Sequence, residues 1–275
     1  MKKEISLCLG GGAARGIAHL GVLEFLESRE VKIKEISGTS MGSLVGACFA
    51  LGFSAREIKK ILDEVNWLKV FHVSFSKVGI VSIEKVEDFL RDKVFGDKKF
   101  SDCNINLKIN ATDIENGEEI IFDSGSILEA VRSSISVPGI FEPGFLQEKI
   151  LVDGGVINNI PVNILDEEDS SRIFVSNVGI PLDKKILYRE YLESNLEGDF
   201  WKKSKMAFEP VAIDFFQKCF DILRASHEKI RLEKIPPENI FSLPYAGIGY
   251  ESFWKAEEIY QLGLDEARKK WGKIF

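Results

Sequence analysis

Short apolar runs alternate with longer amphipathic segments over the first two thirds of the chain. The short runs predict strands at 5–9, 31–36, 105–111, 119–122, 149–152 and 173–178. The segments between them predict helices: one through Leu20, Leu23 and Leu26, one that ends at Leu51, and others at 55–65, 83–94 and 126–133. Strands that alternate with helices in this way are typical of an α/β fold whose central sheet is mostly parallel.

Capping residues and turns mark where several of these elements begin or end. Gly52 is expected to end the second helix, because glycine readily adopts the backbone conformation that follows a helix. Ser54 and Ser82 are expected to cap the two helices that follow them. The sequence Glu115-Asn116-Gly117 separates two strands and predicts a turn.

The last third of the chain is more helical. Apolar residues fall on one face of a predicted helix, a stripe that favours core packing over a membrane-facing surface; they are Phe208, Ala212, Phe215, Phe216, Cys219, Ile222 and Leu223. A second amphipathic helix is predicted at 250–272. We expect a single domain over 1–275, with a core of about 5–180 and a helical C-terminal portion.

One uncharged stretch, 36–55, is long enough to cross a bilayer. Its glycine, serine and threonine residues favour a buried helix behind a tight turn instead. The apolar run after the N-terminal lysines is too short for a signal peptide. We therefore expect a cytoplasmic protein without a membrane span, peripheral to a membrane at most.

Charge and cysteine content exclude several classes of function. The net charge of −7 disfavours nucleic-acid binding, which normally needs a basic face. A local basic patch at 202–205 still allows transient contact with a membrane surface. The cysteines are widely spaced, and Cys8, Cys48 and Cys103 in or beside apolar runs predict buried thiols. The histidines are equally scattered, so we expect no metal and no cofactor.

The sequence Gly38-Thr39-Ser40-Met41-Gly42 lies between a predicted strand and a predicted helix. A serine on a sharp strand-to-helix turn adopts a strained backbone conformation, and the residues two before and two after it must lack bulk. The following helix directs its positive end toward the serine. This setting favours a catalytic serine over an ordinary turn.

A second glycine-rich segment, 10–16, also joins a predicted strand to a helix. Its small residues leave backbone amides free to bind an anion. A dinucleotide site would need an acidic residue after the second strand, and a P-loop would need Gly-Lys-Ser/Thr; neither is present. An oxyanion hole needs only the amides and a nearby nucleophile, so that interpretation is favoured.

Asp153-Gly154-Gly155 follows a predicted strand, and on its own it would indicate a turn. In combination with the two motifs above, it resembles the patatin-like phospholipases, in particular the bacterial branch related to the catalytic domain of neuropathy target esterase. His19, Gly21 and the stretches 111–113 and 131–141 add to the resemblance. It covers roughly 5–180, and the combination of motifs is far more specific than any one of them.

The resemblance implies a three-layer α/β/α fold and a serine lipid acyl hydrolase that works through an acyl-enzyme. It assigns the catalytic dyad to Ser40 and Asp153, and loop support to Arg15. The oxyanion donors become the backbone amides of Gly11, Gly12 and Ala13. Ala13 stands where many members have glycine, which is tolerable if its φ is negative. Asn106 stands where a proline is common.

Three alternatives remain open at this point. The acyl group could pass to an alcohol or lysolipid instead of water. The chain could be a non-catalytic lipid-binding protein, although the intact motifs speak against that. A Ser-His-Asp triad with His227 has an allowed chain order, but the neighbouring residues 224–229 are typical of a solvated helix face.

Overall fold

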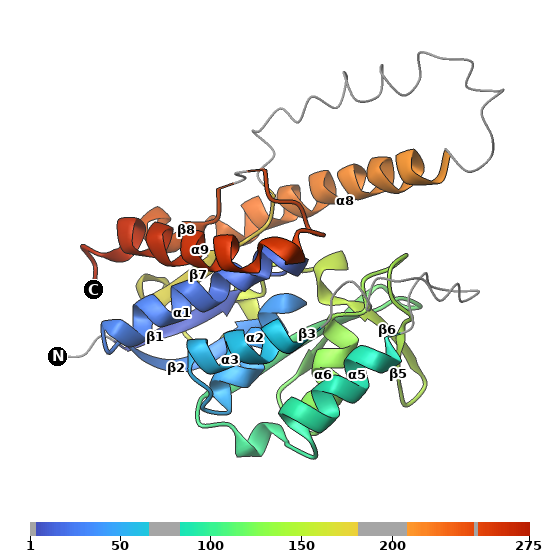
Figure 1. Ribbon diagram of the computed structural model, residues 1–275, viewed down its shortest axis with the longest axis horizontal. Coiled ribbons are helices and arrows are strands. Elements are labelled where there is room, and N and C mark those ends of the chain that lie inside the picture. The colour runs from blue at the N-terminus through green and yellow to red at the C-terminus, as the bar shows by residue number, and fades with distance from the viewer. Residues whose placement is uncertain (1–3, 66–82, 181–207, 245–246) are drawn as a thin grey trace, which may run out of the picture.

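The computed structural model describes residues 4–65, 83–180, 208–244 and 247–275, with the backbone alone for 208–218. A central sheet lies between helical layers (Figure 1). Its strands are β1 (Glu4–Leu9), β2 (Lys32–Gly38), β3 (Asn106–Asp113), β4 (Glu118–Phe122), β5 (Gly144–Leu146), β6 (Lys149–Asp153), β7 (Ile173–Asn177) and β8 (Ile240–Ser242). The helices are α1 (Ala18–Ser28), α2 (Met41–Ala50), α3 (Ala55–Glu64), α5 (Glu84–Leu90), α6 (Ile127–Ser134), α8 (Phe208–Leu232) and α9 (Ala256–Trp271).

Among the described residues, the strand order is β5-β6-β3-β2-β1-β7-β8, with β4 paired to β3. The centre of the sheet, from β3 through β2, β1 and β7 to β8, is parallel, which confirms the predicted fold class. The edge made of β4, β5 and β6 is antiparallel. β5 and β8 were not predicted, because three residues are too few to show a hydrophobic period.

Helix boundaries agree with the local signals in most places. Ser54 forms a capping box with Glu57 at the start of α3, and Ser126 caps α6. Gly52 ends α2 with φ +100, as its position after the helix predicted. The predicted helix 83–94 is shorter than expected, since α5 gives way to a π-helical turn at Arg91–Phe95. Ser82 lies outside the described residues.

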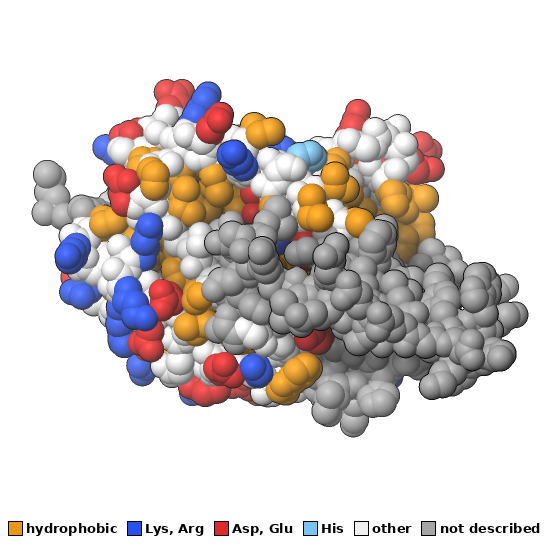
Figure 2. Space-filling view, turned by 90° about the horizontal axis from the view of Figure 1, so that it is seen from above, with side chains coloured by type: hydrophobic (Ala, Val, Ile, Leu, Met, Phe, Trp, Pro, Cys, Tyr) orange, Lys and Arg blue, Asp and Glu red, His pale blue; other side chains and the backbone are white. Residues whose placement is uncertain are grey.

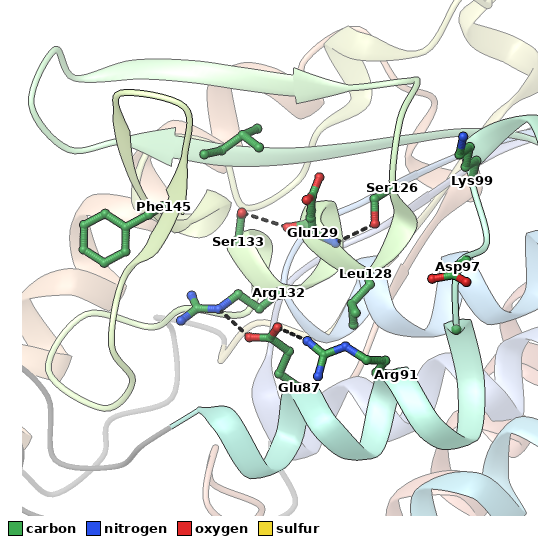
Figure 3. Close-up of a pocket in the computed structure, with 12 residues that line it drawn as sticks. Glu87, Arg91, Asp97, Lys99, Ser126, Leu128, Glu129, Arg132, Ser133 and Phe145 are labelled. Carbon is green, nitrogen blue, oxygen red and sulfur yellow. Dashed lines mark hydrogen bonds and ion pairs between the residues drawn. The ribbon is translucent and has the colours of Figure 1, made fainter.

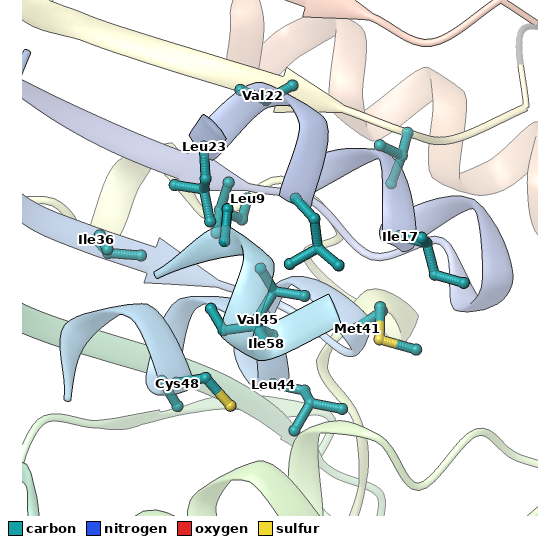
Figure 4. Close-up of a cluster of buried hydrophobic side chains, with 14 of the residues drawn as sticks. Leu9, Ile17, Val22, Leu23, Ile36, Met41, Leu44, Val45, Cys48 and Ile58 are labelled. Atoms are coloured by element: carbon teal, nitrogen blue, oxygen red, sulfur yellow. The ribbon is translucent and has the colours of Figure 1, made fainter. Parts of the chain in front are cut away.

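β1 is buried on both faces, because its apolar residues belong to two different cores on opposite faces of the sheet. Ile5, Leu7 and Leu9 join the larger cluster beneath α1, α2, α3 and α9, while Cys8 joins a smaller cluster on the opposite face. Figure 4 shows part of the larger cluster, where Leu9 lies among side chains of α1 and α2. The smaller cluster is completed by 160–165 and by the end of α8.

The prediction that the apolar stripe of α8 packs in the core is wrong for the side chains that the structure describes. Cys219 is exposed, and Ile222 and Leu223 are 48% and 62% exposed. The buried positions of this helix are polar, Asp221, Arg224 and Glu228 among them, and the stripe residues at 208–218 lie outside the described side chains. Hydrophobic side chains are visible at the surface in Figure 2.

None of the described helices combines the length and apolar character needed to cross a bilayer. The basic patch at 202–205 lies outside the described residues. Of the thiols predicted to be buried, Cys8 and Cys48 are buried and Cys103 is half-buried.

The C-terminal helix α9 packs directly on α1, and two glycines permit this close approach. A Cβ atom on Gly21 of α1 would lie 2.3 Å from the carbonyl oxygen of Tyr260. One on Gly263 of α9 would lie 2.3 Å from the carbonyl oxygen of Ala18. Trp271, at the end of α9, is fully buried. The last turns of the chain are therefore built into the main core.

We expect Gly21→Ala to lower the free energy of unfolding by about 2 kcal/mol, because the added methyl group meets backbone atoms that cannot rotate away. Gly46→Ala in α2 is the matched control, since both changes gain about 1 kcal/mol of helix propensity. At Gly46 the nearest atom is a side-chain methyl of Ile36, at 3.0 Å. Denaturant unfolding of both variants tests this, and equal stability of the two would contradict the close-packing argument.

Candidate functional site

Ser40 lies at the turn between β2 and α2, with backbone angles φ 53 and ψ −125. A positive φ is strained for a residue with a side chain. The flanking glycines are required sterically: a Cβ on Gly42 would lie 2.2 Å from the carbonyl oxygen of Leu9, and one on Gly38 would lie 2.6 Å from that of Gly42. The amide of Ser40 donates to Oγ of Ser134 on α6, at 2.9 Å. The serine is 7% exposed.

Asp153 ends β6, where it pairs with Ala111 of β3, and it is 6% exposed. Its carboxylate accepts a hydrogen bond from the amide of Gly155, at 2.7 Å. Burial raises the pKa of Asp153 to about 6. A hydrogen bond with the Ser40 side chain, the Gly155 amide and the charge of Arg224 act in the opposite direction. The structure therefore brings Asp153 and Ser40 together, and it makes the carboxyl group more basic than usual.

The glycine loop lies against the serine turn. A Cβ on Gly11 would be 3.2 Å from Cβ of Ser40. The Gly11 amide, however, donates to the carbonyl oxygen of Asn159 at 3.1 Å, so it is occupied. The amides of Gly12 and Ala13 have no hydrogen-bond partner among the described residues. Of the three predicted oxyanion donors, the structure thus leaves two available.

The condition under which alanine at position 13 carries no backbone strain, a negative φ, is not met, because the φ of Ala13 is +44. A side chain in this left-handed region costs about 1 kcal/mol relative to the common conformations, a cost that glycine avoids. The backbone around it is held by two hydrogen bonds: the Arg15 amide donates to the Gly12 carbonyl at 2.9 Å, and the Ala14 amide donates to Tyr250 at 3.0 Å.

Arg15 is fully buried and crosses from the glycine loop to the segments that follow β7 and β8. Its Nε donates to the carbonyl of Val178 at 2.7 Å, and its Nη1 donates to that of Ile248 at 2.9 Å. Nη2 contacts the carbonyls of Leu243 and Gly179. The guanidinium therefore connects the loop to the far edge of the sheet.

His19 is fully buried, with Nδ1 2.8 Å from Oγ of Ser176 and Nε2 2.8 Å from the carbonyl oxygen of Gly10. Burial lowers its pKa to about 4, so the ring is neutral at pH 7. Nε2 then carries the proton donated to Gly10. His19 supports the loop backbone, and both its nitrogens are occupied.

His227 is exposed on α8, although its neighbours Arg224 and Glu228 are buried. The expectation that 224–229 forms a solvated face is therefore wrong for those two charges. His72 lies outside the described residues.

Three buried residues near the site escaped the sequence analysis. The side chain of Asn159 donates to Gly11 and to Glu228, and the charge of Arg224 lowers the pKa of Asp153. Asn159 follows Asp153 closely in the chain, but nothing in its pattern distinguishes it from a turn residue. Arg224 and Glu228 were missed because the apolar stripe of α8 predicted that the opposite face of this helix is the buried one.

A separate hollow of about 780 Å³ opens between α5, α6 and β5 (Figure 3). Two of its arginines, Arg91 and Arg132, both pair with Glu87. Neither Ser40 nor Asp153 lines it. Within the described residues, no group of three histidine, cysteine or acidic side chains could hold a metal ion.

Comparison with known proteins decides the family. The model of the patatin-like phospholipase family matches residues 7–166. This range includes the glycine loop, Ser40, Asp153 and Asn159. The chain belongs to this family.

Relatives of this patatin-like chain include an uncharacterised NTE family protein of Mycobacterium tuberculosis, 34% identical over 161 residues, covering 58% of this chain and 44% of the relative. The lysophospholipase NTE1 of Saccharomyces cerevisiae is 29% identical over 290 residues, covering 99% of this chain and 16% of the relative. The chain thus spans less than half the length of each. VipD of Legionella pneumophila, at 15% identity, has the same fold, with a TM-score of 0.57 over 98% of this chain and 67% of that structure.

The raised pKa of Asp153 predicts a stability gain on Asp153→Asn. In the unfolded chain the carboxyl ionises near 3.8, whereas in the folded protein it ionises at about 6. Above pH 6 the folded protein therefore carries the cost of a buried charge, on the order of a few kcal/mol, which asparagine removes. Well below pH 3.8 both states are protonated and that cost disappears.

We expect Asp153→Asn to unfold at a higher temperature than the parent protein at pH 8, and the difference to shrink as the pH falls toward 4. Thermal unfolding across this range measures it. A variant that melts well below the parent at pH 8 would contradict the burial argument.

Proposed function

We propose that this chain hydrolyses acyl esters of lipids through a Ser40–Asp153 dyad and an acyl-enzyme. The observation that carries the proposal is the buried Asp153 carboxyl, with its pKa at about 6 and its hydrogen bond to Ser40. A general base with a pKa near the working pH is ionised and still basic enough to take a proton. The second requirement is a set of donors for an oxyanion. The candidate donors are the amides of Gly12 and Ala13, which have no partner among the described residues and belong to the loop that lies against the serine turn.

In the acylation step, Oγ of Ser40 forms a bond to the ester carbonyl carbon while its proton passes to Asp153. The carbonyl electron pair moves onto the oxygen, which accepts hydrogen bonds from the amides of Gly12 and Ala13. When this tetrahedral species collapses, the ester bond breaks and the alcohol leaves with the proton from Asp153. Water then attacks the acyl-enzyme, with Asp153 again taking and returning one proton.

The histidines described by the structure favour the dyad over a triad. Both ring nitrogens of His19 are engaged in holding Gly10 and Ser176, and its low pKa leaves the ring neutral. His227 is exposed on α8. The strain at Ser40 also supports a catalytic protein over a lipid-binding one, because such strain persists mainly where it serves a function.

The relatives guide the choice of substrate. NTE1 of Saccharomyces cerevisiae is named a lysophospholipase and aligns with 99% of this chain. We therefore propose a monoacyl phospholipid as the first substrate to test. A lipid with a single acyl chain is held only weakly and reversibly in a membrane, so an enzyme at the membrane surface can take it up without inserting into the bilayer.

We expect a fluorophosphonate probe to label the protein at Ser40, because the probe's phosphoryl oxygen occupies the position of the oxyanion. Ser40→Ala should abolish labelling, and Ser226→Ala is the control, since Ser226 is an exposed serine on α8. Mass spectrometry of the labelled peptide measures this. Unchanged labelling of Ser40→Ala would reject Ser40 as the nucleophile.

We expect kcat/KM on a soluble acyl ester to rise with pH to a plateau, with its acidic limb near pH 6, because Asp153 must be ionised to accept the serine proton.

Asp153→Asn should lower the rate by about 10² to 10⁴-fold. His227→Ala should stay within about threefold of the parent, as expected for an exposed residue. Loss of turnover in a folded His227→Ala protein would indicate a triad instead.

A further inference from the structure

The two unoccupied amides of the glycine loop owe their direction to hydrogen bonds on neighbouring carbonyl groups. A peptide group is planar, and its C=O and N–H point in opposite directions. A contact that fixes the carbonyl of one residue therefore also fixes the amide of the next. For Ala13, this contact is the Arg15 amide on the Gly12 carbonyl, at 2.9 Å. For Gly12, it is Nδ2 of Asn159 on the Gly11 carbonyl, at 3.2 Å.

Asn159 forms hydrogen bonds with both the amide and the carbonyl group of Gly11. Its backbone carbonyl accepts from the Gly11 amide at 3.1 Å, while its side chain donates to the Gly11 carbonyl. The side chain also borders the candidate base: a Cβ on Gly155 would lie 2.8 Å from Oδ1 of Asn159 and 3.0 Å from Oδ1 of Asp153. Asn159 is 6% exposed, so these contacts are shielded from water. The residue thus lies between the oxyanion loop and the turn that carries Asp153.

The Asn159 carboxamide is in turn held by α8 (orange in Figure 1). Glu228 accepts from Nδ2 of Asn159 at 2.8 Å through one carboxylate oxygen, and from Nδ2 of Asn177 at 3.3 Å through the other. Arg224 pairs with the same carboxylate at 3.3 Å. Glu228 is only 8% exposed. Because a carboxylate can only accept hydrogen bonds, Glu228 fixes the orientation of the Asn159 carboxamide, with Nδ2 rather than Oδ1 toward α8.

We infer that Asn159 is a positioning residue, which orients the Gly12 amide toward the oxyanion, and that Glu228 of α8 holds Asn159 in the orientation this requires. The inference rests on the proposed function, because it assigns the Gly12 amide as an oxyanion donor. It also gives α8 a role at the site that no motif of the sequence indicates. Polarisation of the Gly11–Gly12 peptide by Asn159 strengthens the amide as a donor.

The test compares Asn159→Ala with Asn177→Ala. Each variant removes one carboxamide that donates to Glu228, but only Asn159 contacts the glycine loop. We expect Asn159→Ala to lower kcat on a p-nitrophenyl acyl ester by about 10- to 100-fold, with KM changed by less than about threefold. The rate of fluorophosphonate labelling should fall in parallel. The acidic limb near pH 6 should stay in place, because Asn159 is not among the groups that shift the pKa of Asp153.

Asn177→Ala should keep kcat within about threefold of the parent, even if its melting temperature falls. Equal kcat losses in the two variants would show a general structural effect and overturn the inference. So would a folded Asn159→Ala protein with the parent kcat. A parent protein that neither hydrolyses the ester nor takes the probe would instead contradict the proposed function.

A second pair of variants applies if Asn159→Ala does not fold. Glu228→Gln keeps an oxygen that accepts from Asn159, whereas Glu228→Ala removes it. We expect the glutamine variant to keep kcat within about threefold and the alanine variant to lose about 10-fold or more at unchanged KM. Circular dichroism establishes that both are folded. Equal activity of these two variants would overturn the role assigned to Glu228.

Discussion

The close approach of β1 to the serine turn is the constraint on which the rest of the site depends. The Leu9 carbonyl lies so near Gly42 that a single methyl group would not fit between them. This contact places the end of β1, and hence the glycine loop, directly beside Ser40. A parallel sheet makes the approach possible, because the carboxyl ends of neighbouring strands open onto the same edge.

Burial at this edge has opposite consequences for the two titratable groups. It raises the pKa of Asp153 and lowers that of His19, because in each case the charged form loses its hydration. The carboxyl becomes basic enough to act on a hydroxyl group, while the imidazole becomes a neutral structural donor. One physical effect thus distinguishes a candidate base from a supporting residue. The proposed dyad needs no histidine, because burial raises the pKa of the Asp153 carboxyl.

The C-terminal part of the chain contributes to the site as well as to the core. α9 packs on α1 through facing glycines, which fixes the helix that follows the glycine loop. α8 contributes buried charge through Arg224 and Glu228, at the cost of exposing Ile222 and Leu223. Burial of charge is costly unless each charged group is paired. Here Arg224 pairs with Glu228, and Glu228 accepts a hydrogen bond from Asn159, whose side chain also donates to Gly11 of the loop. The site therefore depends on residues from both ends of the chain.

The sequence by itself determined the fold class, the serine turn and the position of Asp153 at a strand end. These features are local: apolar period, glycine spacing and strand-to-helix order are visible within short windows of the chain. The tertiary structure alone decided which loop amides are available, since Gly11 is occupied by a residue 148 positions away. It also decided the conformation of Ala13 and the buried face of α8. Hydrogen bonds between distant segments and the cost of burying charge depend on which surfaces meet, and hydrophobic periodicity carries no information about that.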